Sequence, residues 1–167
     1  MRLNLAAGAL LLALPASAQN AVRPDDRTAI EACLQKQTDA PERCIGTVNS
    51  ACEGEPGPDS GTTRAVALCG RRELLVWQEM VEASVARLKT GPLGTMKLQR
   101  PGEGLGADII ADMERTFVIW RAKLCDTFAM QYEGGTASRV LYGDCVYKET
   151  GRHALWLKAL EADAALR

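Results

Sequence analysis

Six cysteines carry the clearest chemistry in this sequence of 167 residues. An even number of cysteines in an exported chain is typical of disulfide bonds. Zinc binding is the alternative, but no two cysteines form a C-x-x-C pair and the chain has a single histidine, so the spacing of a zinc site is missing. We therefore predict disulfide bonds and no metal. The cysteines are Cys33, Cys44, Cys52, Cys69, Cys125 and Cys145.

Candidate catalytic residues are few. His153 is the only imidazole base that a nucleophile could use, and its position on the last expected helix favours a structural or solvated role. Asp108 and Asp112 share a helix face, as a glycosidase pair would, but solvent-facing charges often do the same. Neither G-x-x-x-x-G-K-[ST] nor G-x-G-x-x-G occurs. We predict a protein that is not an enzyme and that binds no cofactor.

Two further groups of residues could bind a partner. Three tryptophans, Trp77, Trp120 and Trp156, could form a stacking platform for a carbohydrate. However, Trp77 and Trp120 fall on apolar helical stripes, so we expect both to lie in the core. A Gly- and Pro-rich loop after Cys52 is acidic. Such a loop is usually a solvated connection, and the alternative is contact with a basic partner. Its acids are Glu53, Glu55 and Asp59.

The N-terminus is typical of a secretory signal peptide. Arg2 gives a basic start, residues 5–14 form an apolar run, and Ala16-Ser17-Ala18 supplies small residues. The apolar run has about half of the roughly 20 residues that a membrane-spanning helix needs, so we expect no stable membrane insertion. Gln19, not a cysteine, would begin the mature chain, which argues against a lipoprotein. We predict cleavage after residue 18 and a protein located in the periplasm or secreted.

The mature chain has the size and charge of a single globular domain. About 150 residues are enough to bury one core. The formal net charge of the whole chain is -1, which argues against nucleic acid as a partner because phosphates require a basic face.

The elements that position the cysteines are predicted to be helices. A helix over residues 28–37 and a second beginning at Asp39, with Asp39 as its N-cap and Pro41 in its first turn, form a hairpin. This hairpin places Cys33 beside Cys44. A loop over residues 53–62 then leads to a long helix that starts at about Thr63 with a threonine cap. Cys52 and Cys69 flank this loop, which makes them the second predicted pair.

A second long helix is predicted over residues 107–132. It follows a Gly- and Pro-rich loop over residues 90–106, whose length suggests mobility or function. Gly134-Gly135 ends this helix, and Thr136 begins another with a kink or break at Gly151. Cys125 and Cys145 flank the turn and form the third predicted pair. The apolar stripe of the second long helix is Ile109, Met113, Phe117, Trp120, Leu124 and Phe128.

These elements define an all-α fold, because no segment alternates as a strand does. We predict a small disulfide-stapled helical bundle with two long antiparallel helices and an N-terminal helical hairpin. Residues 19–62 form the hairpin and acidic loop, residues 63–167 form the larger helical domain, and the two parts pack as one unit.

A group of landmarks over residues 69–160 resembles the N-terminal domain of the lysozyme-inhibitor family named for LprI. The family pattern has an arginine after the threonine. Here Arg152 lies one position before that place, and His153 occupies it. The N-terminal piece with three further cysteines is a second departure. The matching residues are Cys69, Glu73, Trp77, Trp120, Arg121, Cys125, Gly134, Gly135, Thr136, Cys145 and Thr150.

The LprI-like resemblance implies a bacterial envelope protein whose motif residues are structural. It further implies non-covalent inhibition of a lysozyme or other cell-wall hydrolase, with the acidic loop or the loop over residues 90–106 blocking the enzyme's cleft. The alternative is an envelope binding or scaffold module that recognises a cell-wall fragment or a periplasmic protein without inhibiting lysozyme. An exposed aromatic cluster would favour that alternative.

Overall fold

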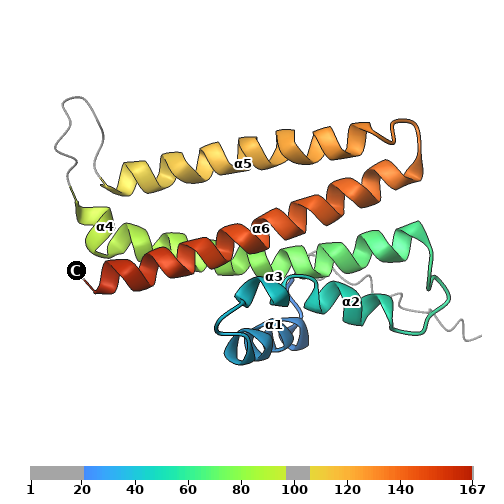
Figure 1. Ribbon diagram of the computed structural model, residues 1–167, viewed down its shortest axis with the longest axis horizontal. Coiled ribbons are helices and arrows are strands. Elements are labelled where there is room, and N and C mark those ends of the chain that lie inside the picture. The colour runs from blue at the N-terminus through green and yellow to red at the C-terminus, as the bar shows by residue number, and fades with distance from the viewer. Residues whose placement is uncertain (1–20, 97–105, 167) are drawn as a thin grey trace, which may run out of the picture.

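A computed structural model describes residues 21–96 and 106–166 of the chain, so the predicted signal peptide over residues 1–18 lies outside the described residues. Within these ranges the chain is helical and contains no strand (Figure 1), which confirms the predicted all-α, disulfide-stapled bundle. The helices are α1 (Pro24–Lys36), η2 (Pro41–Cys44), α2 (Thr47–Glu53), α3 (Thr63–Thr90), α4 (Pro92–Thr95), α5 (Gly106–Met130) and α6 (Thr136–Ala165).

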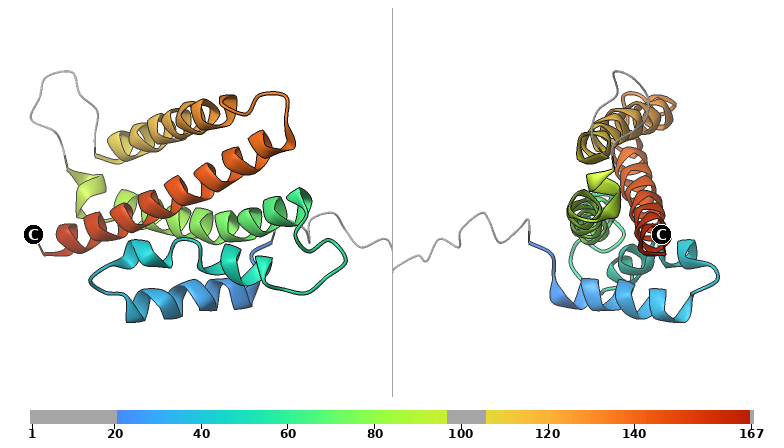
Figure 2. Two further views of the ribbon diagram at one scale, coloured as in Figure 1. Left: turned by 45° about the vertical axis from the view of Figure 1, so that its right-hand side comes forward. Right: turned by 90° about the vertical axis from the view of Figure 1, so that its left-hand side faces the viewer.

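The helices are arranged in three layers. Figure 2 shows α5 on one side, α3 and α6 in the middle, and α1 with α2 on the other side. α3 and α6 run in the same direction and α5 runs antiparallel to both (Figure 1). The middle layer therefore separates the N-terminal hairpin from α5.

Of the kink or break predicted at Gly151, the break is wrong, because α6 is one helix of 30 residues. Gly151 is buried where α6 crosses two neighbours, and a Cβ there would lie 3.0 Å from Cγ1 of Ile45 and 3.2 Å from Cε2 of Trp77. A glycine inside a helix costs about 1 kcal/mol relative to alanine. Here the missing side chain permits close packing, which offsets that cost and gives the bundle a third long helix.

Several helix boundaries also differ from the prediction. The segment after the first turn is a 3-10 helix that begins at Pro41, and Asp39 does not cap it, because Ala40 occupies the cap position. By contrast, α3 begins at Thr63 as predicted, and its threonine cap is Thr62, whose Oγ1 accepts the N–H of Ala65 at 3.2 Å. Inside the predicted loop over residues 90–106, residues 92–95 form α4, and residues 97–105 lie outside the described residues.

All six cysteines form disulfide bonds, and the three predicted pairs are confirmed. Cys33 binds Cys44, Cys52 binds Cys69, and Cys125 binds Cys145, at sequence separations of 11, 17 and 20 residues. Disulfides persist in oxidising environments, so the chain belongs to an oxidising compartment.

None of the helices within residues 21–96 and 106–166 combines the length and apolar character that crossing a membrane requires.

The apolar core has two main parts. One lies between α1, α2, α3 and α6 and contains Ile30, Val48, Val76, Trp77 and Ala154. The other lies near α4 and contains Leu88, Ile110 and Leu157. A smaller cluster of Cys125, Cys145 and Val146 joins α5 to α6.

Candidate functional site

Glu73 is a buried carboxylate that joins α3 to the N-terminal hairpin. Its Oε1 accepts the backbone N–H of Gly46 at 2.5 Å and the indole N–H of Trp77 at 2.9 Å, and its Oε2 accepts the N–H of Asn49 at 2.8 Å. Gly46 precedes α2 with φ 103° and provides no side-chain cap. The Glu73 carboxylate therefore satisfies the free N–H groups at the start of α2 and complements the dipole of that helix.

Arg121 links α5 to α6 beneath the surface. Its Nη1 donates to Oγ1 of Thr150 at 2.6 Å, and that hydroxyl donates to the carbonyl of Val146 at 2.6 Å. The guanidinium carbon lies 5.4 Å from the ring centre of Phe117, within cation–π range. Removal from water lowers the pKa of Arg121 below its ordinary value.

His153 is buried between an acid and an aromatic ring. Its Nε2 lies 2.7 Å from Oε1 of Glu114, and its ring stacks on Phe117 with centroids 3.7 Å apart and planes at 11°. Nucleophilic catalysis would require a hydroxyl or thiol bonded to this imidazole. The hydroxyl one turn earlier on α6 belongs to Thr150, and it is engaged with Arg121 and a backbone carbonyl.

The carboxylate pair considered for glycoside hydrolysis lies on the outer surface of α5. Asp112 accepts a hydrogen bond from Arg115 at 2.9 Å, and both side chains are exposed. Asp108 is exposed as well. The described geometry supplies no enclosing cleft around these two acids.

The predicted core location of Trp120 is wrong. Trp77 is fully buried, but Trp120 is 49% exposed and Trp156 is 50% exposed. Ile109 and Phe128, from the same predicted stripe as Trp120, are also exposed. α5 is an outer helix that packs chiefly on α6, so its apolar stripe is wider than the face it buries (Figure 1).

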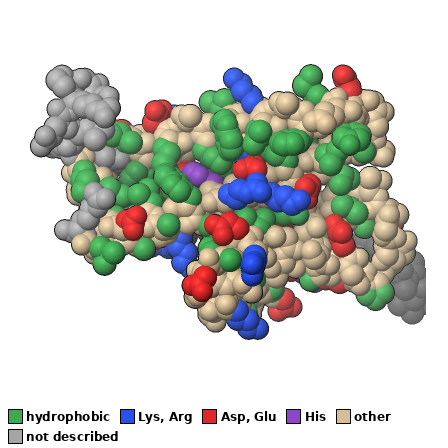
Figure 3. Space-filling model, viewed as in Figure 1, with side chains coloured by type: hydrophobic (Ala, Val, Ile, Leu, Met, Phe, Trp, Pro, Cys, Tyr) green, Lys and Arg blue, Asp and Glu red, His purple; other side chains and the backbone are tan. Residues whose placement is uncertain are grey.

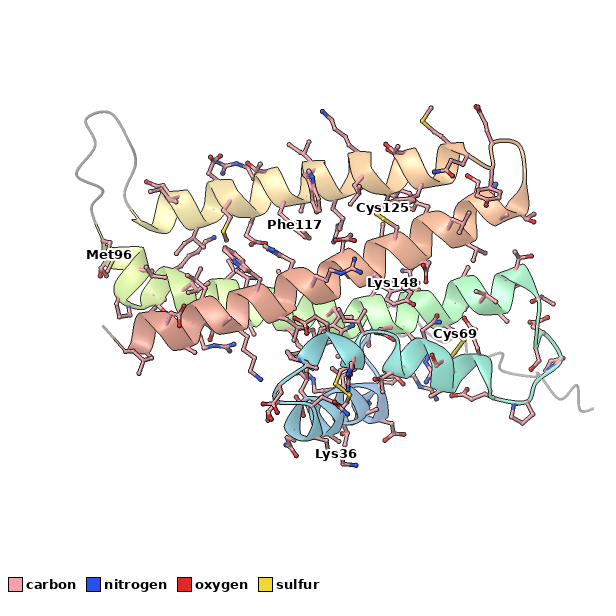
Figure 4. All side chains as sticks on the ribbon, in the orientation of Figure 1. Lys36, Cys69, Met96, Phe117, Cys125 and Lys148 are labelled. Carbon is pink, nitrogen blue, oxygen red and sulfur yellow. A yellow bond between two sulfur atoms is a disulfide. The ribbon has the colours of Figure 1, made fainter. Side chains whose placement is uncertain are left out.

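Four rings form a continuous series across the α5–α6 seam, which we call the aromatic ladder. Trp120 lies 6.0 Å from Phe117, Phe117 lies 3.7 Å from His153, and His153 lies 5.8 Å from Trp156, measured between ring centroids. Figure 4 labels Phe117 on the side of α5 that faces α6. Trp120, a residue of the LprI-like motif, therefore belongs to a partly exposed surface, which the sequence pattern did not indicate.

The acids of the loop between α2 and α3 differ in their contacts. Glu53, the last residue of α2, accepts Nδ2 of Asn49 at 2.8 Å. Glu55 accepts Nη1 of Arg72 at 3.0 Å. The Asp59 side chain is exposed, and the contacts recorded at this residue involve its backbone carbonyl. Asp59 is therefore the acid most available to an outside partner.

The loop itself is held by bonds at both ends. The Cys52–Cys69 disulfide closes it. Oγ of Ser60 accepts the N–H of Gly57 at 3.0 Å and donates to the carbonyl of Glu55 at 2.9 Å. These contacts give the loop a defined conformation, although it lies outside the helices.

A pocket of about 390 Å³ lies beneath this loop. Its lining combines apolar side chains such as Val66 and Leu68 with the acids Glu55 and Asp59, and we call it the acid-rimmed pocket. Leu68 is 51% exposed. The acids could be predicted from the sequence, but the apolar floor could not, because it depends on how the loop lies over the start of α3.

The two glycines between α5 and α6 belong to a turn. Gly134 has φ 86°, a conformation that favours glycine, and Gly135 precedes α6 as its N-cap. The turn lies at the same end of the molecule as the acidic loop (Figure 1). The motif residues are thus distributed over three places: the Glu73 anchor, the α5–α6 seam and this turn.

Comparison of the chain with models of known protein families, with curated proteins and with solved structures finds no match in any of the three.

Proposed function

We propose that the protein is exported through a signal peptide over residues 1–18 to the periplasm or the cell exterior, and that it inhibits a lysozyme or a similar basic cell-wall hydrolase. The inhibition is non-covalent and works by occlusion. The observation that carries this proposal is the acid-rimmed pocket on a loop closed by a disulfide. The LprI-like resemblance of residues 69–160 points to the same activity.

The pocket has the chemistry to receive a lysine or arginine side chain. Such side chains bury their alkyl stems against apolar surface while the charged end stays near water or an acid. Val66 and Leu68 provide the apolar contact, and Glu55 and Asp59 also line the pocket. Glu55 is paired with Arg72, so Asp59 is the more available acid. A basic protein surface therefore fits this loop better than an acidic or purely apolar one.

The loop is prepared for binding because little of it has to become ordered. Arg72, on α3, holds Glu55 and also forms two hydrogen bonds to Asp26, at 2.6 and 3.0 Å. These bonds raise the pKa of Arg72 above its ordinary value, so it remains a cation. A preformed loop avoids part of the entropy cost of association.

The first test measures hydrolysis of bacterial cell walls by several lysozymes with and without the oxidised protein. We expect at least one lysozyme to be inhibited at micromolar inhibitor, and the inhibition to weaken as salt rises, because exposed charges are screened. Full activity of every lysozyme at micromolar excess would refute the proposed function.

A charge-matched pair of variants tests the loop. Glu55→Gln combined with Asp59→Asn should weaken inhibition about tenfold, which corresponds to about 1.4 kcal/mol of binding free energy. The control combines Asp108→Asn with Asp163→Asn, which remove the same charge from exposed residues at the opposite end of the molecule (Figure 1). Equal inhibition by both double variants would show that the loop is not the binding element.

A further inference from the structure

The aromatic ladder is a partly exposed cluster that has no role in the inhibition proposed for the acidic loop. Its two terminal indoles, Trp120 and Trp156, are each about half exposed, and the rings between them are nearly or partly buried. Figure 3 shows a small part of the single histidine of the chain, with hydrophobic side chains beside it and charged side chains on its other side. Tryptophan is a highly buried residue on average, so two half-exposed indoles in one cluster mark a binding surface.

The ladder rings have similar orientations, which suits a ligand with flat faces. The planes of Phe117 and His153 differ by 11°, those of His153 and Trp156 by 17°, and those of Phe117 and Trp120 by 37°. Phe117 and His153, with centroids 3.7 Å apart, stack face to face and cover each other, so the exposed ring surface is that of the terminal indoles. These two half-exposed indoles, one on α5 and one on α6, can contact different units of a chain-like ligand.

The inner rings are fixed in place before any ligand arrives. Glu114 is bonded to His153, and Arg121 lies over Phe117 while it donates to Thr150. Rigid aromatic side chains bind with little loss of conformational freedom. The ladder is thus preorganised in the way that a recognition surface requires.

The surrounding charges narrow the ligand class. Single-stranded nucleic acids also stack on aromatic rings, but they require a basic groove for their phosphates. The cations beside the ladder are already engaged, because Arg152 is paired with Glu149 and the part-buried Arg121 lies over Phe117 and donates to Thr150. Glu114 adds a carboxylate. A pyranose ring fits better, because it has an apolar C–H face that stacks on an indole and hydroxyl or acetamido groups at its edge.

We propose that the aromatic ladder binds a glycan chain of N-acetylated hexoses, the saccharide class of the bacterial cell wall. The glycan lies across the α5–α6 seam and stacks on Trp120 and Trp156 through different sugars. The assignment to cell-wall sugar rests on the export that we propose above, but it is independent of lysozyme inhibition. It corresponds to the envelope-module alternative that an exposed aromatic cluster favours.

This site is tested by titrating the protein with N-acetylglucosamine oligomers and measuring binding by calorimetry and by tryptophan fluorescence. We expect the tetramer to bind the oxidised protein more tightly than the monomer, and Trp120→Ala and Trp156→Ala each to weaken tetramer binding tenfold or more. Trp156→Phe keeps a ring and should retain part of the affinity. Tyr132→Ala is the matched control, because it removes a ring that is 53% exposed and lies outside the ladder.

Three results would overturn the glycan proposal. They are no tetramer binding by the unmodified protein at millimolar sugar, equal losses in the Tyr132 and tryptophan variants, and equal binding of a glucose tetramer. Circular dichroism of each variant shows whether it has folded. The Glu55→Gln, Asp59→Asn double variant should bind the tetramer normally, so failure of the inhibitor proposal and failure of the glycan proposal are distinguished.

Discussion

Replacing Glu73 with alanine is expected to reduce the free energy of unfolding by about 4 kcal/mol. The change leaves three donors without an acceptor, namely the buried indole N–H of Trp77 and the part-buried backbone N–H groups of Gly46 and Asn49. A buried donor that loses its partner costs about 1–3 kcal/mol. Because small domains are stable by only about 5–15 kcal/mol, this single change removes a large share of the total.

Urea unfolding of the oxidised protein measures the effect of Glu73→Ala. Glu73→Gln keeps the side-chain shape and one acceptor oxygen, so its cost should be about half as large. Glu82→Ala is the control on the same helix, and as an exposed residue it should change stability by less than about 0.5 kcal/mol. A loss below about 1 kcal/mol for Glu73→Ala would show that the carboxylate does not anchor α2.

Removing the Cys125–Cys145 disulfide by changing both residues to alanine should cost about 3 kcal/mol. The bridge closes a segment with a sequence separation of 20 residues, and the chain-entropy model gives about this value for such a loop. Cys125 is fully buried and Cys145 nearly so, within a small cluster with Val146. α5 packs chiefly on α6 (Figure 4), so it is the helix most dependent on this bond.

Hydrogen exchange combined with urea unfolding checks the disulfide prediction. In the Cys125→Ala, Cys145→Ala variant, we expect the amides of α5 to lose protection before those of α3. The comparison variant, Cys33→Ala with Cys44→Ala, should instead loosen α1 and leave the relative protection of α5 unchanged. Uniform loss of protection across α3 and α5 in the first variant would contradict the special dependence of α5 on this bridge.

The helices and the disulfide pairing were predictable because both depend on short-range patterns. Each cysteine pair flanks a local turn or loop, so helix periodicity and turn residues place the two sulfur atoms near each other without knowledge of the tertiary fold. The Cys125–Cys145 pair shows this most clearly, since Gly134-Gly135 marks the turn between its helices. The helix boundaries were less accurate, as Asp39 and the α4 turn inside the predicted loop over residues 90–106 show.

The errors concern residues whose surroundings come from distant parts of the chain. Gly151 appeared to be a helix break because propensity describes an isolated helix, whereas Ile45 and Trp77 are brought to it only by folding. Trp120 appeared to be a core residue because periodicity identifies an apolar face but not how much of that face a neighbour covers. Both proposed binding surfaces include residues whose exposure depends on contacts between distant parts of the chain.

The order of the three disulfides along the chain affects how the protein matures. Each cysteine is joined to the next one in sequence, at separations of 11, 17 and 20 residues, so no bridge encloses or interleaves with another. A chain that enters an oxidising compartment N-terminus first exposes its thiols in that same order. If the chain is exported as we propose, oxidation of each newly arrived pair yields the native bond directly, so we expect the protein to mature with a thiol oxidant and without reshuffling of wrong pairs.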